Sequence, residues 1–292
     1  MSASGPRSIT VAEALRRAGE HLDRRPLLVV SDFDGTLSRI ELDPWAAAIL
    51  PLGRQALRRL AGMAGVHVVV LSGRTARDVA ARVRVGNVTY LGNHGMERGH
   101  VARGRRPDRL VPAIDESPAA AVDAAQRVAD GIRHHISEEW LVVEHKAPAV
   151  ALHYRTAPDL EGAASRVADA VDALDPDGIL QRYPGRRVLE LRPVGATAKG
   201  QTMAALIQEL RPASVFMLGD DVSDAEAFVA LREARRAGQT DGVAIAVHAR
   251  AEAPAEVLEA ADMVLASPRD ATRFLSALAT ALAARDASED RA

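Results

Sequence analysis

The 292-residue chain contains no cysteine. Without thiols it can form no disulfide, no zinc–thiolate site and no iron–sulfur cluster, a composition that suits the reducing cytoplasm. It also lacks an apolar run of about 18 residues and the apolar stretch typical of a signal peptide. We therefore expect a cytoplasmic protein without a membrane partner.

The chain also lacks a strong excess of charge of one sign. Its formal net charge is −2, so no overall field attracts nucleic acid, and specificity must come from a local site. A basic cluster at residues 103–109 contains glycine and proline and is typical of an exposed hinge. We expect no nucleic-acid partner. The sequence leaves the oligomeric state open, and a monomer is the working expectation.

Lysine is scarce in this chain. Two of the 37 basic residues are lysines, Lys146 and Lys199, which leaves 35 arginines. In a chain that uses arginine at almost every basic position, the two ammonium groups mark places that need a compact point charge. Chance retention is the alternative for either residue alone.

A predicted strand ends in two acids. Residues 27–31 are four apolar residues and a serine, and they lead into Asp32-Phe33-Asp34-Gly35-Thr36. Apolar runs are typical of buried parallel strands, and ligands bind beyond the carboxyl ends of such strands. Alternation places Asp32 and Asp34 on one side and turns Phe33 into the core. Two carboxylates this close favour a shared hard cation such as Mg²⁺, whereas an ordinary surface turn is the alternative.

A second acidic segment, Gly219-Asp220-Asp221-Val222-Ser223-Asp224, follows residues 213–218, which are apolar apart from Ser214. Its three carboxylates repel one another by about 1 kcal/mol per close pair unless a cation neutralises them. Lys199 precedes a predicted helix at 201–210. A cation at a helix N-terminus interacts unfavourably with the helix dipole, and an anion bound beside Lys199 would explain its position. Together these segments predict an Mg²⁺ site that includes Asp220. The alternative for Asp224 is a helix N-cap.

Two further strand ends carry polar residues. Ser72-Gly73-Arg74 follows a strand at 66–71 and precedes a helix at 76–83, which suits a phosphate oxygen or, alternatively, simple helix capping. The right-handed crossover rule places this segment beside the first strand. A strand at 88–91 leads to Gly92-Asn93-His94-Gly95, a loop suited to face a substrate. An ordinary turn is the alternative for His94.

The pattern changes between residues 106 and 193. A helix (117–136), strands (140–145, 149–154), a second helix (160–173) and further strands (178–183, 187–191) predict an α+β domain with an antiparallel sheet. It interrupts a core formed by residues 1–105 and 194–292, and we expect it over the acidic edge. Its strand ends carry Glu144, Lys146, Arg155 and Glu190, which form either a polar face that binds hydroxyls or ordinary cross-strand pairs.

The remaining pattern predicts further elements of the core. Helices are expected at 11–22, at 45–64 with a break near Pro51, at 225–234 and at 269–284. Strands are expected at 243–247 and 263–265. The small and acidic residues from Asp286 onward predict a disordered tail.

These motifs resemble those of haloacid dehalogenase-like phosphohydrolases and, more narrowly, of trehalose-6-phosphate phosphatases. The resemblance implies an α/β fold with a Rossmann-like parallel-sheet core and an inserted α+β cap domain that sets specificity. It covers nearly the whole chain and rests on residues 32–37, 72–74, 92–97, Glu144 with Lys146, 153–155, 190–193, 199–200 and 219–228.

The resemblance also implies roles for these residues. Asp32 is the nucleophile, Asp34 is the acid/base, and Ser72 and Lys199 hold phosphoryl oxygens. Mg²⁺ binds Asp32, the main-chain carbonyl of Asp34 and Asp220, and Asp224 completes the metal site by orienting metal-bound water or Lys199. The substrate, a sugar phosphate, is bound by Gly73, Arg74, Asn93, His94, Glu144, Lys146, Arg155 and Glu190.

The implied reaction is Mg²⁺-dependent hydrolysis of trehalose 6-phosphate through an aspartyl-phosphate. Alternatives are a phosphatase for another sugar phosphate, such as sucrose 6-phosphate or mannosyl-3-phosphoglycerate, a phosphomutase of similar fold, or a domain that binds a sugar phosphate without turnover. The chain departs from the family pattern at three positions. Ser223 replaces the usual Thr and keeps its hydroxyl, Arg39 replaces Pro, and Ala225 replaces a Glu whose role therefore does not carry over.

Overall fold

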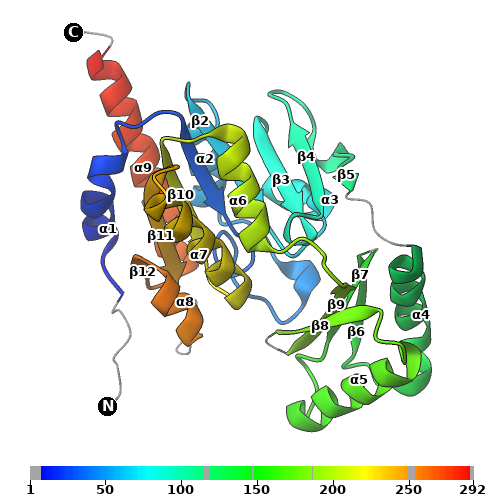
Figure 1. The fold of residues 1–292 in the computed structure, drawn as a ribbon. Helices are drawn as coiled ribbons and strands as arrows, with labels where there is room; N and C mark the ends of the chain where they lie inside the picture. Colours follow the sequence, from blue (N-terminus) through cyan, green and yellow to red (C-terminus); the bar gives the residue numbers. More distant parts are fainter. Residues whose placement is uncertain (1–7, 115–118, 147, 186, 249–253, 290–292) are drawn as a thin grey trace. The chain divides into compact units, whose positions relative to one another are not determined.

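The structure is a computed structural model that describes residues 8–114, 119–146, 148–185, 187–248 and 254–289. The chain forms two compact units, one of residues 1–114 with 197–292 and the other of residues 115–196 (Figure 1). Within the described ranges, every helix is too short or too polar to cross a membrane.

The first unit contains a sheet with the strand order β12-β11-β10-β1-β2-β3-β4-β5. Pairing is parallel from β12 to β3, and the last two strands, β4 and β5, are antiparallel. The central strand β1 therefore has parallel neighbours on both sides. The strands are β1 (Leu27–Ser31), β2 (Val66–Leu71), β3 (Val88–Gly92), β4 (Glu97–Val101), β5 (Ala113–Ile114), β10 (Ser214–Gly219), β11 (Asp241–Val247) and β12 (Met263–Leu265).

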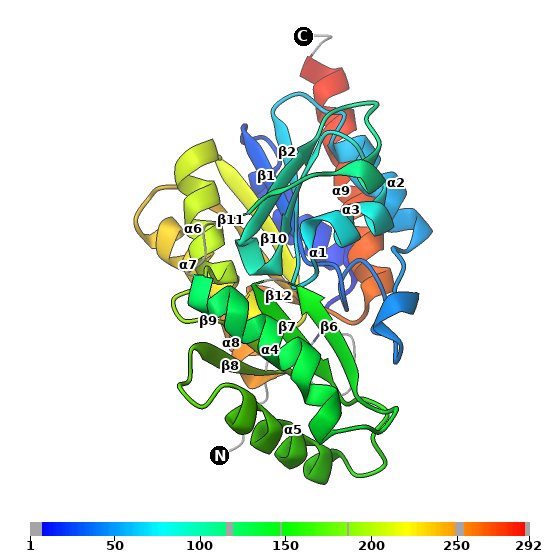
Figure 2. The same cartoon turned by 90° about the vertical axis from the view of Figure 1, so that its right-hand side faces the viewer.

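Two apolar clusters cover the two faces of this sheet. Leu27 and Val29 of β1 pack into one cluster, and Leu28 and Val30 pack into the other, because successive side chains of a strand point to opposite faces. In Figure 2, α6 and α7 lie to the left of the sheet, and α2, α3 and α9 lie to its right. The helices are α1 (Val11–Ala18), α2 (Pro51–Leu60), α3 (Ala76–Val83), α6 (Lys199–Leu210), α7 (Val222–Arg236), α8 (Ala255–Ala260) and α9 (Pro268–Glu289).

The second unit packs two helices on an antiparallel sheet of order β6-β7-β9-β8. The helices α4 and α5 contribute apolar residues such as Val128 and Val167 to a cluster with Val150 and Leu191 of the sheet. The unit therefore has a core of its own. Its elements are α4 (Ala119–His135), β6 (Val142–Lys146), β7 (Ala149–His153), α5 (Leu160–Leu174), β8 (Leu180–Gly185) and β9 (Val188–Pro193), in the order the sequence predicts.

The local structure differs from the predictions at three places. The single broken helix at 45–64 is instead a short 3₁₀ turn, η2 (Pro44–Ala46), followed by α2, because Pro51 occupies the first turn of a new helix. The strands β4 and β5 were not predicted, since the buried positions of β4 include Glu97 and Gly99 rather than apolar residues alone. The tail expected to be disordered from Asp286 continues α9 to Glu289.

Candidate active site

Three neighbouring strands of the first unit end in polar segments. Asp32 follows β1, Ser72 follows β2 and Asp220 follows β10. Because β1 pairs in parallel with both β10 and β2, the three carboxyl ends lie at one edge of the sheet. The topology therefore brings together side chains that are up to 188 residues apart, the span from Asp32 to Asp220.

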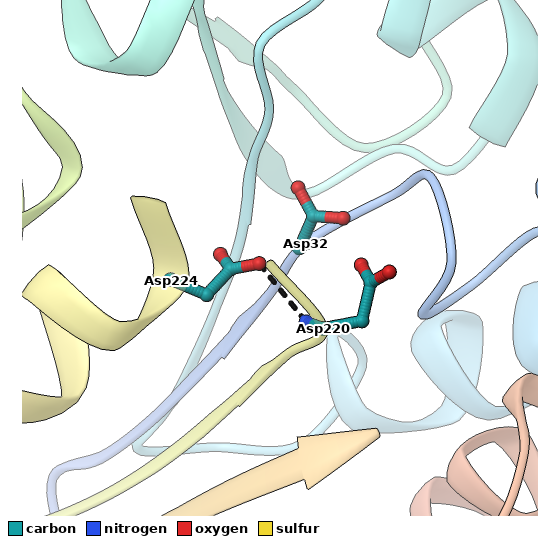
Figure 3. Close-up of side chains that lie close together, drawn as sticks. All are labelled: Asp32, Asp220 and Asp224. Atoms are coloured by element: carbon teal, nitrogen blue, oxygen red, sulfur yellow. Dashed lines mark hydrogen bonds between the residues drawn. The ribbon is translucent and has the colours of Figure 1, made fainter. Parts of the chain in front are cut away.

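Carboxylates from β1, β10 and α7 converge at this edge (Figure 3). One ligand oxygen from each of Asp32, Asp220 and Asp224 lies within 4.8 Å of the others. The Oδ2 atom of Asp224 accepts hydrogen bonds from the main-chain N–H groups of Asp220 (3.0 Å) and Asp221 (3.2 Å), which fixes its orientation. Asp224 is fully buried.

Two glycines allow this close approach. A Cβ atom at Gly219 would lie 2.2 Å from Cγ of Asp224, and one at Gly35 would lie 2.0 Å from Oδ2 of Asp220. Gly35 also has φ +82°, a conformation that L residues rarely adopt. The glycines of both acidic motifs are therefore required by the packing of the carboxylates.

Lys199 is the counter-charge of the cluster. It is the first residue of α6, its side chain is 1% exposed, and its Nζ lies 2.7 Å from Oδ1 of Asp32 and 2.7 Å from Oδ1 of Asp224. Burial lowers the pKa of Lys199, but the two carboxylates raise it well above its usual value. The lysine is therefore a buried cation between the nucleophile predicted for β1 and the acid of α7.

One buried lysine does not neutralise three carboxylates. Burial raises the pKa of Asp32 to about 7, although Lys199 acts in the opposite direction. Burial, and then the negative charge of Asp32, raises the pKa of Asp220 well above its usual value. Three oxygen ligands with excess negative charge fit a hard divalent cation such as Mg²⁺. Among the described residues, the carboxylate of Asp34 is not part of this group.

The segment after β2 is held in place by its own backbone. The main-chain N–H of Arg74 donates to Oγ of Ser72 (3.2 Å), and Ser72 is buried. A Cβ at Gly73 would lie 2.9 Å from Nε2 of His94, so the two predicted binding segments pack against each other. The side chain of Arg74 pairs with the carboxylate of Asp34, and its predicted role in binding substrate stays a prediction.

The segment after β3 is a strained turn, η3 (Asn93–Gly95). Asn93 and His94 both have positive φ, 46° and 60°, which is uncommon for residues other than glycine. The Asn93 amide donates to Oε1 of Glu97 (2.7 Å), and Oε2 of Glu97 accepts from the N–H of Ala76 at the start of α3 (2.6 Å). Glu97 lies in the motif at 92–97, but no role was predicted for its carboxylate. The available signal was a Glu two residues after Gly95, and its burial is visible only in the structure.

The second unit carries a buried cluster of charges on β6, β7 and β9. The Nζ of Lys146 lies 3.1 Å from Glu190 and 4.0 Å from Glu144, and Nε2 of His153 lies 3.1 Å from Glu144. Arg192 contacts Glu190 at 2.8 Å. Arg155 follows β7 and is partly exposed. The structure thus groups Glu144, Lys146 and Glu190, and their substrate-binding role stays a prediction.

The side chain at position 225, one of the departures from the family pattern, is buried among apolar residues. Ala225 is 6% exposed and packs in the same apolar cluster as Leu28 and Phe228. Ser223 keeps the hydrogen bond expected of a hydroxyl, because its Oγ donates to Oδ1 of Asp221 at 2.7 Å. That carboxylate also accepts from the N–H of Asp224 and caps α7. The N-cap that the sequence allowed for Asp224 is therefore Asp221.

Comparisons with known proteins agree with this geometry. A family model described as trehalose-phosphatase matches residues 30–259. A protein of Mycolicibacterium paratuberculosis named trehalose-phosphate phosphatase is 37% identical over 277 residues, which cover 93% of this chain and 66% of that protein. This chain thus spans just under two thirds of that relative's length.

Solved structures share the fold. The C-terminal domain of trehalose-6-phosphate phosphatase from Candida albicans matches with a TM-score of 0.74 at 21% identity, over 94% of this chain and 99% of that one. A haloacid dehalogenase-like hydrolase from Bacteroides thetaiotaomicron matches with a TM-score of 0.57 at 16% identity, over 86% and 97%. The predicted α/β class with a mainly parallel sheet is confirmed. With its acidic edge built from the motif residues and a family model matched over most of its length, the chain belongs to the trehalose-phosphatase family.

Proposed function

We propose that this protein is an Mg²⁺-dependent phosphatase that hydrolyses trehalose 6-phosphate to trehalose and phosphate. The observation that carries the proposal is the pair of 2.7 Å contacts from buried Lys199 to Asp32 and Asp224, within a family whose name specifies the reaction. Burying charged groups in the protein lowers its stability unless the charges are paired. A buried cluster of charges is therefore a candidate for a functional site.

Asp32 is the nucleophile in this proposal. A carboxylate oxygen of Asp32 forms a bond to phosphorus while the bond between phosphorus and the sugar oxygen breaks. Asp34 donates a proton to the departing sugar oxygen. Water then attacks phosphorus, Asp34 accepts its proton, and the bond to Asp32 breaks to release phosphate. Ser72 and Lys199 hold the phosphoryl oxygens, and Lys199 keeps the attacking carboxylate oriented.

Asp32, Asp220 and Asp224 are the residues that would hold the metal, with the main-chain carbonyl of Asp34 as a further predicted ligand. When bound there, Mg²⁺ neutralises charge on the phosphoryl group. Burial raises the pKa of Asp220 and of Asp224, and the neighbouring carboxylates raise both further, which supports a requirement for a cation at this edge. The cation requirement is tested by removing divalent ions with a chelator, which should abolish turnover, and by restoring activity with Mg²⁺.

The second unit supplies the sugar contacts in this proposal. Lys146, Glu144 and Glu190 form a compact set of donors and acceptors of the kind that binds sugar hydroxyls, and Arg155 adds a further donor. The unit then acts as the cap, with predicted bounds 106–193. A cytoplasmic location and the lack of nucleic-acid or membrane partners stay predictions from the sequence, and a monomer stays a working expectation.

A substrate panel tests the proposed function. Phosphate release with Mg²⁺ is measured from trehalose 6-phosphate, sucrose 6-phosphate and mannosyl-3-phosphoglycerate, and we expect the highest kcat/KM for the first. A rate on trehalose 6-phosphate no higher than on its rivals would remove the narrow assignment. Binding of a sugar phosphate without phosphate release would instead support the non-catalytic alternative.

A single substitution tests the nucleophile. Asp32→Asn should lower kcat at least about 1,000-fold while the circular dichroism spectrum stays that of the parent, because the amide cannot attack phosphorus. Asp108→Asn is the matched control, since this carboxylate lies in an exposed turn and pairs only with Arg106 among the contacts found. Equal activity of Asp32→Asn and its parent would contradict the assignment.

A further inference from the structure

Arg74 holds the predicted acid/base, Asp34, through both carboxylate oxygens. Its Nε donates to Oδ2 of Asp34 at 2.6 Å, and its Nη2 donates to Oδ1 at 2.9 Å. This is the parallel, two-bond geometry in which a planar guanidinium fixes the plane of a carboxylate as well as its position. The motif around Ser72 was expected to bind phosphate, yet its arginine is bound to another residue of the site.

The arginine is the fixed partner of this pair. The Arg74 side chain is 8% exposed, whereas the Asp34 side chain is 38% exposed. The guanidinium has two further anchors, the main-chain carbonyl of Pro44 (2.7 Å) and Oδ2 of Asp78 (3.1 Å), and it lies over the ring of Phe33 at 5.6 Å. Four hydrogen bonds engage four of its five N–H donors.

The main chain of Arg74 is fixed as well. Its N–H donates to Oγ of Ser72 (3.2 Å), and its carbonyl accepts from the N–H of Asn93 (2.8 Å). Burial lowers the pKa of Arg74, but its hydrogen bonds to Asp34 raise the pKa above the usual value, so it stays a cation. A buried cation with several anchors thus holds a more exposed acid.

We propose that Arg74 is a positioning residue that acts on the reaction through Asp34, rather than a residue that binds substrate. This inference rests on the proposed function, because it assigns Asp34 the proton-transfer role. A group that transfers a proton must lie within hydrogen-bond reach of the reacting oxygen, and a displacement of about 1 Å can cost a factor on the order of 100 in rate. The two-bond pair removes the rotation of the Asp34 side chain that would allow such a displacement.

A double-mutant cycle on the full-length protein tests the proposal. Arg74→Ala is expected to lower kcat on the accepted sugar phosphate by a factor of about 10 to 100, with KM changed less than about threefold. Once Asp34→Ala is present, adding Arg74→Ala should change the rate by less than about twofold, because the arginine has nothing left to position. Losses that multiply in the double variant, or a loss confined to KM, would overturn the proposal.

Arg82→Ala is a matched control. Arg82 contacts the same Asp78 (2.8 Å) and the main-chain carbonyls of Trp45 (3.0 Å) and Ala47 (2.5 Å) in the same turn. In the described part of the chain, no hydrogen bond or ion pair joins Arg82 to Asp34. The Arg82→Ala variant therefore measures the effect of lost contacts between α3 and this turn, with the contacts of Asp34 unchanged. We expect its kcat to stay within about twofold of the parent. A loss equal to that of Arg74→Ala would show that Arg74 supports only the turn.

Arg74→Lys is the second variant, for use if Arg74→Ala fails to fold, because it keeps the charge and most of the volume of the side chain. An ammonium cannot donate two parallel hydrogen bonds, so we expect this variant also to lose kcat at nearly unchanged KM. Full activity of folded Arg74→Lys would contradict a role for the two-bond pair.

An activated ester separates this inference from the proposed function. The dinitrophenolate of 2,4-dinitrophenyl phosphate leaves without a proton, so Asp34 is needed only for hydrolysis of the phosphorylated Asp32. Arg74→Ala should show a burst of dinitrophenolate that approaches one equivalent, followed by a slowed steady state. A burst slowed as strongly as the steady state would overturn the inference. If the parent releases no phosphate from any sugar phosphate, the proposed function is wrong. The burst with the aryl phosphate still tests the role of Arg74 in that case.

Discussion

Lys199 is the buried counter-charge of the acidic cluster. It is buried between Asp32 and Asp224, and both carboxylates depend on it for a counter-charge. Lys199→Met is expected to lower the free energy of unfolding by about 3 kcal/mol in metal-free buffer, because removal of one partner leaves buried charge without compensation. Urea unfolding measures this loss, and an unchanged midpoint and slope would contradict it.

Tyr90 offers a test that is independent of the acidic cluster. Its hydroxyl is buried and donates to the carbonyl of Val85 at 2.7 Å. Tyr90→Phe should cost about 1 kcal/mol of unfolding free energy at pH 7.

The same residue predicts a pH dependence. Burial raises the pKa of Tyr90 above its usual value, so the folded state keeps the proton while the unfolded chain loses it above about pH 10. The stability that the hydroxyl contributes is thus fully present below that pH and is lost as the pH rises further. The difference in unfolding free energy between Tyr90→Phe and the parent should shrink between pH 9 and pH 11, by about 1 kcal/mol or more. A constant difference would show that the phenol ionises freely in the folded protein.

At the scale of single residues, the sequence predicted which side chains converge but not how they pair. The scarcity of lysine singled out Lys199, and the apolar runs before Asp32 and Asp220 placed both at strand ends. The pairing of Arg74 with Asp34 could not be predicted, because it depends on the path of residues 35–44 that also brings the carbonyl of Pro44 to the guanidinium. No periodic pattern encodes such a path.

At the scale of elements, Glu97 links two segments of the site. It is the first residue of β4, and its carboxylate binds the amide of Asn93 in η3 and the N–H of Ala76 in α3. A carboxylate at a helix N-terminus is also favoured by the helix dipole.

Glu97→Ala should therefore loosen the start of α3 and the strained turn together. We expect a loss of about 2 kcal/mol in unfolding free energy, because two buried donors lose their acceptor. Hydrogen exchange should also be faster at Ala76 than in the parent. Glu97→Gln keeps one acceptor and should lose less. Equal exchange rates in all three proteins would contradict this role.

Short apolar runs that end in polar residues predicted most strands of the large sheet. Strands such as 66–71 and 263–265 match the structure because their residues are almost all apolar, with His67 the one polar residue in the two runs. The strands β4 and β5 were missed because their pairing, and not their composition, makes them strands. The broken helix expected at 45–64 is a shorter helix in the structure, because Pro51 lies in the first turn of α2.

At the scale of the whole molecule, the second unit has its own sheet and apolar core. If it provides the sugar contacts, Lys146→Ala should lower kcat/KM for trehalose 6-phosphate by a factor on the order of 10 to 100, the loss expected for a charged hydrogen bond of about 1.5–3 kcal/mol. Its rate on an activated aryl phosphate should be nearly unchanged.

Arg182→Ala is the control for that substitution. Arg182 lies in the same unit and pairs with Asp172 on the surface, so we expect parental kinetics with both substrates. Equal losses on the sugar and the aryl substrate in Lys146→Ala would place the lysine outside the specificity site.

The central claim is that Asp32 takes up the phosphoryl group. The most direct measurement is peptide mass spectrometry of enzyme that is acid-quenched during turnover of trehalose 6-phosphate with Mg²⁺. The account predicts a phosphoryl group on the peptide that contains Asp32, and none in the Asp32→Asn variant. A phosphoryl group on another residue, or full turnover with Asp32 unmodified, would contradict it.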